Sequence, residues 1–204
     1  MLKALIGDGL DPFLQGTSRF VQRLGLRPNT LTFIGVGVNG LAAWALAEGE
    51  WLAGCSLIVL AGFFDILDGA VARNCQQASA FGSFLDSVLD RYSDLSLLVG
   101  LLIFYSRQGR VGYQVLLGLA IMGTALVPYT RARAETLIPR CSVGVMERPE
   151  RILLIFLGAA IESLMPIVIW ILAVFTNITV FQRIHYTWRQ MKEKEKAQRQ
   201  NSSE

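Results

Sequence analysis

The sequence predicts an all-α integral membrane protein, with six transmembrane helices preceded by an amphipathic surface helix. Hydrophobic residues make up 52% of the 204 positions. Several apolar runs approach or exceed the roughly 18–20 residues that a helix needs to cross a bilayer. Four aspartates lie in one short window between such runs. A carboxylate at the centre of a membrane helix costs roughly 2.5–3.5 kcal/mol, so this cluster indicates a function.

The six expected spans form one membrane domain over residues 30–189. Each is a run of mainly apolar residues bounded by charged or turn-forming ones, and the fifth is the shortest. The spans are Thr30–Ala47, Leu52–Ala72, Phe81–Tyr105, Val111–Tyr129, Ile152–Ile161 with its flanks, and Pro166–Ile184.

Residues 1–29 form an N-terminal segment at the cytoplasmic membrane surface. Within Asp11–Arg27, apolar residues such as Phe13 and Phe20 share one helical face. Arg19 and Arg23 lie on another face, together with Arg27. This pattern favours an amphipathic helix in the membrane interface, and a polar leader helix is the alternative.

Basic residues set the expected orientation, because cytoplasmic connections of membrane proteins are rich in lysine and arginine. They gather in the N-terminal segment, in residues 131–151 and in the tail, residues 190–204. The connection at 106–110 is an exception, because it would lie on the opposite side of the membrane and yet carries two arginines. The balance predicts a cell-membrane protein with both termini and the active site in the cytoplasm. The tail contacts anionic lipid or is simply a solvated helix end. A net charge of +3 does not suggest a nucleic-acid partner.

The four aspartates are spaced to share helix faces. Asp65 and Asp68 are three residues apart, and Asp86 and Asp90 are four apart. Two helices joined by the turn around 74–80 would turn all four carboxylates toward one point. Oxygen ligands of this kind suit Mg²⁺ or Mn²⁺, and four carboxylates can hold two ions. Two ions close together are a common device for transferring phosphorus groups.

Glycines and an arginine accompany the acids. Gly69 and Gly82 leave room for a phosphate ligand near the backbone, and Arg73 offers a positive fork. Together these residues satisfy the pattern D-x₂-D-G-x₂-A-R-x₈-G-x₃-D-x₃-D over positions 65–90. With this pattern the chain resembles the CDP-alcohol phosphotransferases. The resemblance extends over nearly the whole chain, because that family also has six spans behind a surface helix.

The resemblance implies a reaction and a set of roles. A phosphatidyl or similar group moves from a CDP-linked lipid to an alcohol, and CMP is released. Asp65, Asp68 and Asp86 would bind the metal ions, and Asp90 would bind one ion and act as the general base. Contacts with the CDP moiety would come from Asn29, Thr32, Gly69, Arg73 and Ser79. A homodimer and contact with membrane lipid are also expected.

The second half of the chain bears on the acceptor. Segments 131–135, 147–151 and 182–185 resemble the phosphatidylinositol phosphate synthases and their archaetidylinositol phosphate relatives. By that resemblance, Arg131, Arg151 and Arg183 would grip the phosphate of inositol phosphate, although lysine is usual at the first position. Three converging arginines also suit a phosphorylated acceptor on chemical grounds. Two alternatives stay open, a phosphatidylglycerophosphate synthase using glycerol 3-phosphate and a divalent-cation transporter.

Overall fold

The computed structural model describes residues 28–74 and 79–201, and this part of the chain contains helices and no strand. The helix expected at Asp11–Arg27 lies outside the described residues. The helices are α3 (Pro28–Glu48), α4 (Trp51–Asn74), α5 (Ala80–Arg107), α6 (Val111–Ala134), α7 (Arg148–Ala160), the 3₁₀ turn η2 (Glu162–Leu164) and α8 (Met165–Asn201).

Each expected span coincides with one of these helices, and four of the helices are long and apolar enough to cross a membrane. These four are α3, α4, α6 and α8. Helix α5 has 28 residues, or about 42 Å of length, but its acidic residues lower its hydropathy. Helix α7 has 13 residues. It therefore reaches about 20 Å, which is less than the roughly 30 Å hydrocarbon core.

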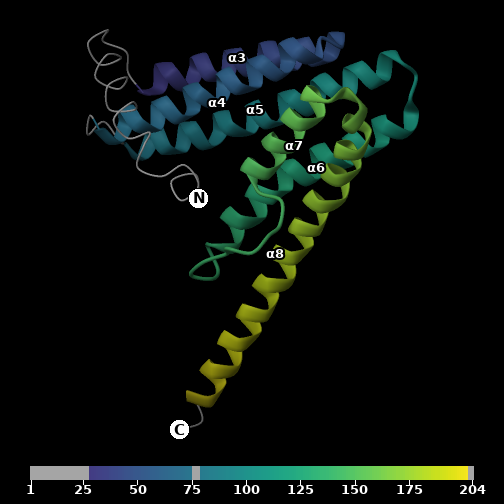
Figure 1. Cartoon of the computed structure of the whole chain (residues 1–204). Helices are drawn as coiled ribbons and strands as arrows, with labels where there is room; N and C mark the ends of the chain where they lie inside the picture. Colours follow the sequence, from purple (N-terminus) through teal and green to yellow (C-terminus); the bar gives the residue numbers. More distant parts are fainter. Residues whose placement is uncertain (1–27, 75–78, 202–204) are drawn as a thin grey trace.

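The helices pack as two connected groups (Figure 1). Helices α4 and α5 both lie against α3, and α6 pairs with α8. Helix α5 contacts α6, and the short helix α7 contacts both α4 and α8. The start of α7 thereby joins the two groups at the level where α4 and α5 carry their aspartates. Helix α8 extends far beyond the other helices toward the C terminus.

Two glycines allow the closest helix contacts. A Cβ atom on Gly100 of α5 would lie 2.2 Å from the carbonyl oxygen of Ala43 in α3. A Cβ atom on Gly123 of α6 would lie 2.1 Å from the hydroxyl of Thr176 in α8. Small residues at such contacts are typical of membrane helices, where close packing replaces hydrophobic burial as the main stabilising force. They fix α5 against α3 and α8 against α6.

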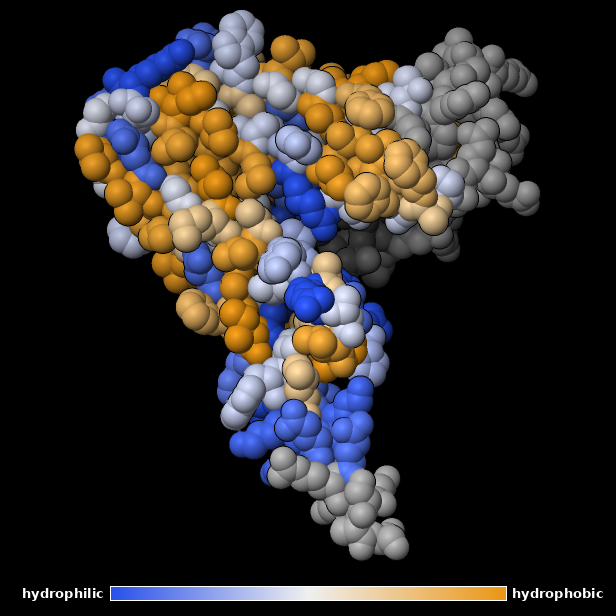
Figure 2. Space-filling view, turned by 180° about the vertical axis from the view of Figure 1, so that it is seen from behind, coloured by the Kyte–Doolittle hydropathy of each residue, from blue (hydrophilic) through white to orange (hydrophobic). Residues whose placement is uncertain are grey.

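The outer surface of the helical body is hydrophobic. Large apolar side chains project outward from every long helix, among them Trp44, Leu52, Phe81, Val111 and Phe181, each more than half exposed. Figure 2 shows hydrophobic side chains over most of the body and hydrophilic ones at the end where α8 protrudes. Water would penalise such a surface and a bilayer would accept it. The protein is therefore a multi-pass membrane protein.

Helix α8 is longer than its apolar run. It continues from Ile184 to Asn201, so most of the segment expected as a charged tail is a helical extension. The connection between α6 and α7 packs against this extension through a small cluster. Cys141 is fully buried there, next to Tyr186 and Met191 of α8. This contact holds the 135–147 connection, and thus the start of α7, in place.

Candidate active site

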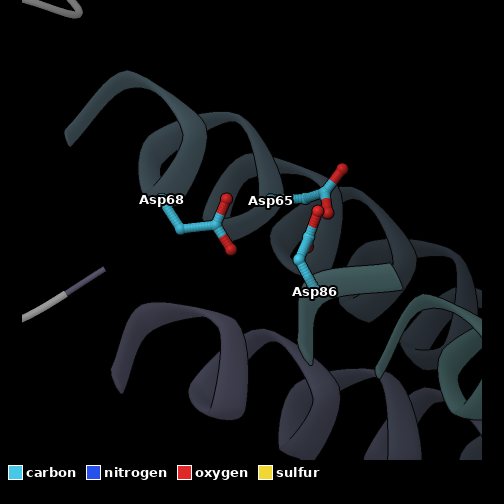
Figure 3. A group of neighbouring side chains, drawn as sticks. All are labelled: Asp65, Asp68 and Asp86. Carbon is cyan, nitrogen blue, oxygen red and sulfur yellow. The ribbon is translucent and has the colours of Figure 1, made fainter. Parts of the chain in front are cut away.

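Three of the four predicted carboxylates meet between α4 and α5. Asp65, Asp68 and Asp86 each offer an oxygen within 4.8 Å of the others. Figure 3 shows the first two side chains on one helix, with Asp86 approaching them from another. Oδ2 of Asp68 is buried and has no hydrogen-bond partner among the described residues. Such an atom is costly unless something binds it, so this trio fits a divalent cation.

Asp90 lies outside this group of three. Its Oδ1 is 2.8 Å from Nη1 of Arg148, at the start of α7. The same Nη1 atom lies 3.3 Å from Asp65 Oδ2, so one guanidinium links the cation site to Asp90. The sequence predicted four carboxylates turned toward one point. The structure gathers three of them and places the fourth beside an arginine that also contacts Asp65.

Asp90 and Arg148 stand between two cavities. The smaller one, about 50 Å³, is lined by Thr32, Asp65 and Asp68 as well as by this pair. The larger one, about 400 Å³, is lined by the same pair together with residues of α6 and α8. Asp90 is thus accessible both from the carboxylate site and from a chamber large enough for a polar molecule. A group in this position can act on a bond formed between ligands of the two cavities.

The larger cavity contains the three arginines predicted as a phosphate clamp. Arg131 comes from α6, Arg151 from α7 and Arg183 from α8, and all three line this one cavity. The structure therefore brings together residues that lie 52 positions apart in the chain at their extremes. Five arginines and four acids line the cavity: Arg91, Arg131, Arg148, Arg151, Arg183, Asp90, Asp94, Glu135 and Glu147.

Arg183 is fixed by backbone carbonyls. Its side chain is 2% exposed, and it donates from Nη1 to the oxygen of Val127 at 2.5 Å and from Nε to that of Val143 at 2.9 Å. Gly144 follows with φ +140°, and a Cβ atom there would lie 2.6 Å from Thr179 of α8. Glycine thus allows the connection to approach α8 closely enough to hold Arg183.

Arg151 is held by an acid that the predicted site did not include. Its Nη2 donates to Asp94 Oδ2 at 2.5 Å, and both side chains are 6% exposed. Asp94 Oδ1 also accepts from Nε of Arg148 at 3.3 Å. The Arg131 side chain, by contrast, is 41% exposed. Its Nε lies 3.2 Å from Oε1 of Glu135, and its Nη1 lies 3.6 Å from Oε1 of Glu147.

Asp94, Glu147 and Arg148 are the residues that the predicted site missed. Asp94 continues the four-residue spacing of Asp86 and Asp90, which places it one turn further along the same helix face, but the sequence predicted no role for it. Glu147 and Arg148 adjoin the predicted Arg151 in the run Glu-Arg-Pro-Glu-Arg. The sequence shows where these residues lie along the chain. It does not predict which acid pairs with which arginine, because that depends on how α5 packs against α7.

The expected CDP contacts lie near the carboxylates. Gly69 follows Asp68 on α4, and Thr32 of α3 lines the small cavity. Ser79 is the N-cap of α5, and its hydroxyl accepts a hydrogen bond from the amide of Gly82 at 2.9 Å. Asn29 and Arg73 belong to α3 and α4, but their side chains lie outside the described part of the chain.

Comparison with known proteins identifies the family. Residues 26–182 match the family model described as CDP-alcohol phosphatidyltransferase. The archaetidylinositol phosphate synthase of Methanothermobacter thermautotrophicus is 37% identical over 193 residues, covering 90% of this chain and 96% of that protein. The phosphatidylinositol phosphate synthase of Streptomyces avermitilis is 34% identical over 193 residues, covering 86% and 76% respectively.

Solved structures give the same result. The phosphatidylinositol phosphate synthase of Mycobacterium tuberculosis with CDP-DAG bound superposes with a TM-score of 0.81 at 29% identity, covering 86% of this chain and 93% of that one. Its complex with manganese and citrate also gives 0.81, at 30% identity, covering 86% and 88%. The aspartate pattern, the helical membrane body and these matches agree, and the chain therefore belongs to the CDP-alcohol phosphatidyltransferase family of transferases.

Proposed function

We propose that this enzyme transfers a phosphatidyl-type group from a CDP-linked lipid to inositol phosphate and releases CMP. The lipid part of the donor is diacylglycerol or archaeol. One observation carries the choice of acceptor. The cavity that contains Arg131, Arg151 and Arg183 shares Asp90 with the carboxylate site. A phosphorylated alcohol bound to the arginines would present its hydroxyl to Asp90. The names of the relatives from Methanothermobacter and Streptomyces support the same acceptor.

The donor site is the group of three carboxylates. Asp65, Asp68 and Asp86 would hold two divalent ions, Mg²⁺ or Mn²⁺, with Asp90 as a further ligand. When bound, such ions neutralise the pyrophosphate of the CDP-lipid and the charge that develops on it. The buried Oδ2 atom of Asp68, which has no hydrogen-bond partner in the part of the chain that the structure describes, supports this assignment. So does the complex of the mycobacterial relative with manganese. Asn29, Thr32, Gly69, Arg73 and Ser79 would contact the CDP moiety.

Asp90 is the proposed general base. It would accept the proton of the acceptor hydroxyl, whose oxygen then attacks the lipid-side phosphorus while the bond to the CMP oxygen breaks. Arg148 would orient the Asp90 carboxylate, because its Nη1 lies 2.8 Å from Oδ1. It holds Asp65 at the same time, and so would keep the base in a fixed position relative to the donor site.

The acceptor phosphate would lie among the three arginines. Guanidinium groups bind phosphate through paired, charge-assisted hydrogen bonds. Two of the three are already oriented, since Arg151 is held by Asp94 and Arg183 by two backbone carbonyls. A preorganised site loses little side-chain entropy when its ligand binds. A neutral alcohol has no anionic group with which these guanidinium groups could pair.

The membrane arrangement follows the same proposal. Helices α5 and α7 would complete six spans with α3, α4, α6 and α8, α7 being continued by its flanking residues. Both termini and both cavities would face the cytoplasm, in accordance with the basic connections at 131–151 and the basic extension of α8. The N-terminal segment, residues 1–29, would lie in the interface, and two copies of the chain would form a homodimer.

An acceptor panel tests the proposal. The purified protein is incubated with labelled CDP-diacylglycerol, Mg²⁺ and either inositol phosphate, inositol or glycerol 3-phosphate, and CMP release is measured. We expect rapid release only with inositol phosphate.

Changing Arg131, Arg151 or Arg183 to Gln should raise the acceptor KM by about one to two decades, the equivalent of a charge-assisted hydrogen bond. The KM for the CDP-lipid should change little. Glycerol 3-phosphate as the only acceptor would reassign the enzyme to phosphatidylglycerophosphate synthesis. Metal uptake into vesicles without CMP release would indicate a transporter.

A further inference from the structure

Glu147 places an anion between two arginines of the acceptor cavity. Its Oε1 atom lies 3.0 Å from Nη2 of Arg183 and 3.6 Å from Nη1 of Arg131. A single carboxylate oxygen thus bridges two of the three guanidinium groups that the proposed function assigns to the acceptor phosphate. A phosphate oxygen has the same charge and the same need for donors, so the two anions would compete for these positions.

The two ends of this bridge differ in how firmly they are held. Arg183 is buried and also donates to two backbone carbonyls, so its position does not depend on Glu147 alone. The Glu147 side chain is 43% exposed. As the N-cap residue of α7 it makes no side-chain capping bond, so it is not needed to begin the helix. If the contact breaks, the carboxylate can turn into water while the arginine stays in place.

The charge balance of the cavity favours displacement. Its five arginines and four acids leave a net charge near +1, which is less than an inositol phosphate dianion requires. Asp90 and Asp94 cannot leave, because both are paired with Arg148, and Asp94 is also buried against Arg151. Glu147 is the acid in direct contact with Arg183 that is free to move away. Its departure would release positive charge at the position of the incoming phosphate.

We propose that Glu147 is a displaceable internal anion, which occupies the acceptor-phosphate position of the empty enzyme and determines its specificity. The inference rests on the proposed function. A phosphorylated acceptor replaces the carboxylate with its own phosphate, and so compensates Arg131 and Arg183 again. A neutral polyol has no group for this exchange and would leave the carboxylate in place. Glu147 therefore weakens acceptor binding in general and rejects unphosphorylated alcohols in particular.

The test uses Glu147→Gln, which keeps the size of the side chain and removes its charge. Glu193→Gln is the matched control. It changes the net charge by the same amount, but on the extension of α8, where Glu193 contacts Gln190. The dissociation constant for inorganic phosphate is measured by calorimetry on the full-length protein in detergent, and the KM values for inositol phosphate and CDP-diacylglycerol from CMP release. Loss of a half-exposed competing ion pair should tighten phosphate binding and lower the acceptor KM about two- to fivefold.

The control should match the wild type, and the KM for CDP-diacylglycerol should not change in either variant. Unchanged or weaker phosphate binding in Glu147→Gln would overturn the inference, the weaker result meaning that Glu147 holds the arginines in place. Glu147→Ala, which removes the side chain, should also tighten phosphate binding. It shows that the effect of Glu147→Gln does not come from the new amide group. Arg183→Gln distinguishes a failure of this inference from a failure of the proposed function. If it abolishes phosphate binding while Glu147→Gln has no effect, only the inference fails. If the wild type binds no phosphate, both the proposed arginine site and this inference are wrong.

Discussion

Asp94 offers the sharpest test of how the acceptor cavity is built. Its buried carboxylate accepts from Arg151 at 2.5 Å and from Arg148 at 3.3 Å. Asp94→Asn keeps the shape but replaces one acceptor oxygen with an NH₂ donor that faces a guanidinium. Arg148 retains Asp65 and Asp90. Among the described residues, Arg151 retains only the carbonyl of Met146, at 3.3 Å, and its Nε has no partner there. The loss therefore falls on Arg151.

The magnitude follows from the burial of both partners. Removing one member of a buried ion pair costs about 3–5 kcal/mol, because the other charge is left uncompensated. In a protein of this size each kcal/mol lowers the melting temperature by about 2–4 °C. Asp94→Asn should therefore melt about 6–20 °C below the wild type in detergent. A released Arg151 would also bind the acceptor phosphate less well, so the acceptor KM should rise while that of the CDP-lipid stays the same.

A double variant distinguishes packing from function. Asp94→Leu combined with Arg151→Met replaces the ion pair with apolar side chains of similar size, a change that is often neutral for stability. Most of the melting temperature should return, and acceptor binding should remain weak. Thermal melts and CMP-release kinetics on Asp94→Leu, Arg151→Met and the double variant, compared with the wild type, form a complete cycle. If Asp94→Asn left both the melting temperature and the acceptor KM unchanged, the assigned role of Asp94 would be refuted.

Three further outcomes are expected. Asp90→Asn should fold normally and lose about 10²–10⁴-fold in turnover, as CMP release measures, because the general base is gone; near-normal turnover would refute that role. A chelator should abolish activity, Mg²⁺ or Mn²⁺ should restore it, and Asp65→Ala or Asp86→Ala should raise the metal concentration required; full activity in excess chelator would exclude the two-ion proposal. Gly100→Ala should lower the free energy of unfolding by about 1–3 kcal/mol, because its Cβ would lie 2.2 Å from the carbonyl oxygen of Ala43. Gly118→Ala is the control and should be neutral or stabilising, because nothing lies within 4 Å of its Cβ. Equal melting temperatures for the two variants would show that α3 and α5 are not tightly packed at Gly100.

The sequence predicted those features that depend on local spacing. Apolar runs located every helix from α3 to α8, because the membrane demands length and composition over a continuous segment. The three-residue spacing of Asp65 and Asp68 placed both on one face of α4, so their approach to Asp86 could be foreseen. The apolar pattern did not predict the extension of α8 to Asn201. Its lysine, glutamate, glutamine and alanine residues favour helix on their own, and no glycine or proline follows Pro166 to stop it.

The pairing of charges could not be predicted in the same way. Arg148 and Arg151 reach Asp94 across 54 and 57 residues of chain, and these contacts exist because α7 packs beside the acidic part of α5. Spacing along one helix gives no information about which acid an arginine on another helix will meet. Spacing therefore could not show that Arg148 lies 2.8 Å from the Asp90 carboxylate in the structure, and the role of Asp90 as a metal ligand stays a prediction.

The acids of the acceptor cavity divide by burial into two kinds. Several arginines close together in a membrane protein repel one another and need counter-charges before a substrate arrives. Asp94 meets this need permanently, because it is buried and bonded to two guanidinium groups. A carboxylate held in that way cannot give up its place to a phosphate. Glu147 meets the same need at the open side of the cavity, where water can receive it. An anion site that must be stable when empty and still bind a phosphate requires acids of both kinds.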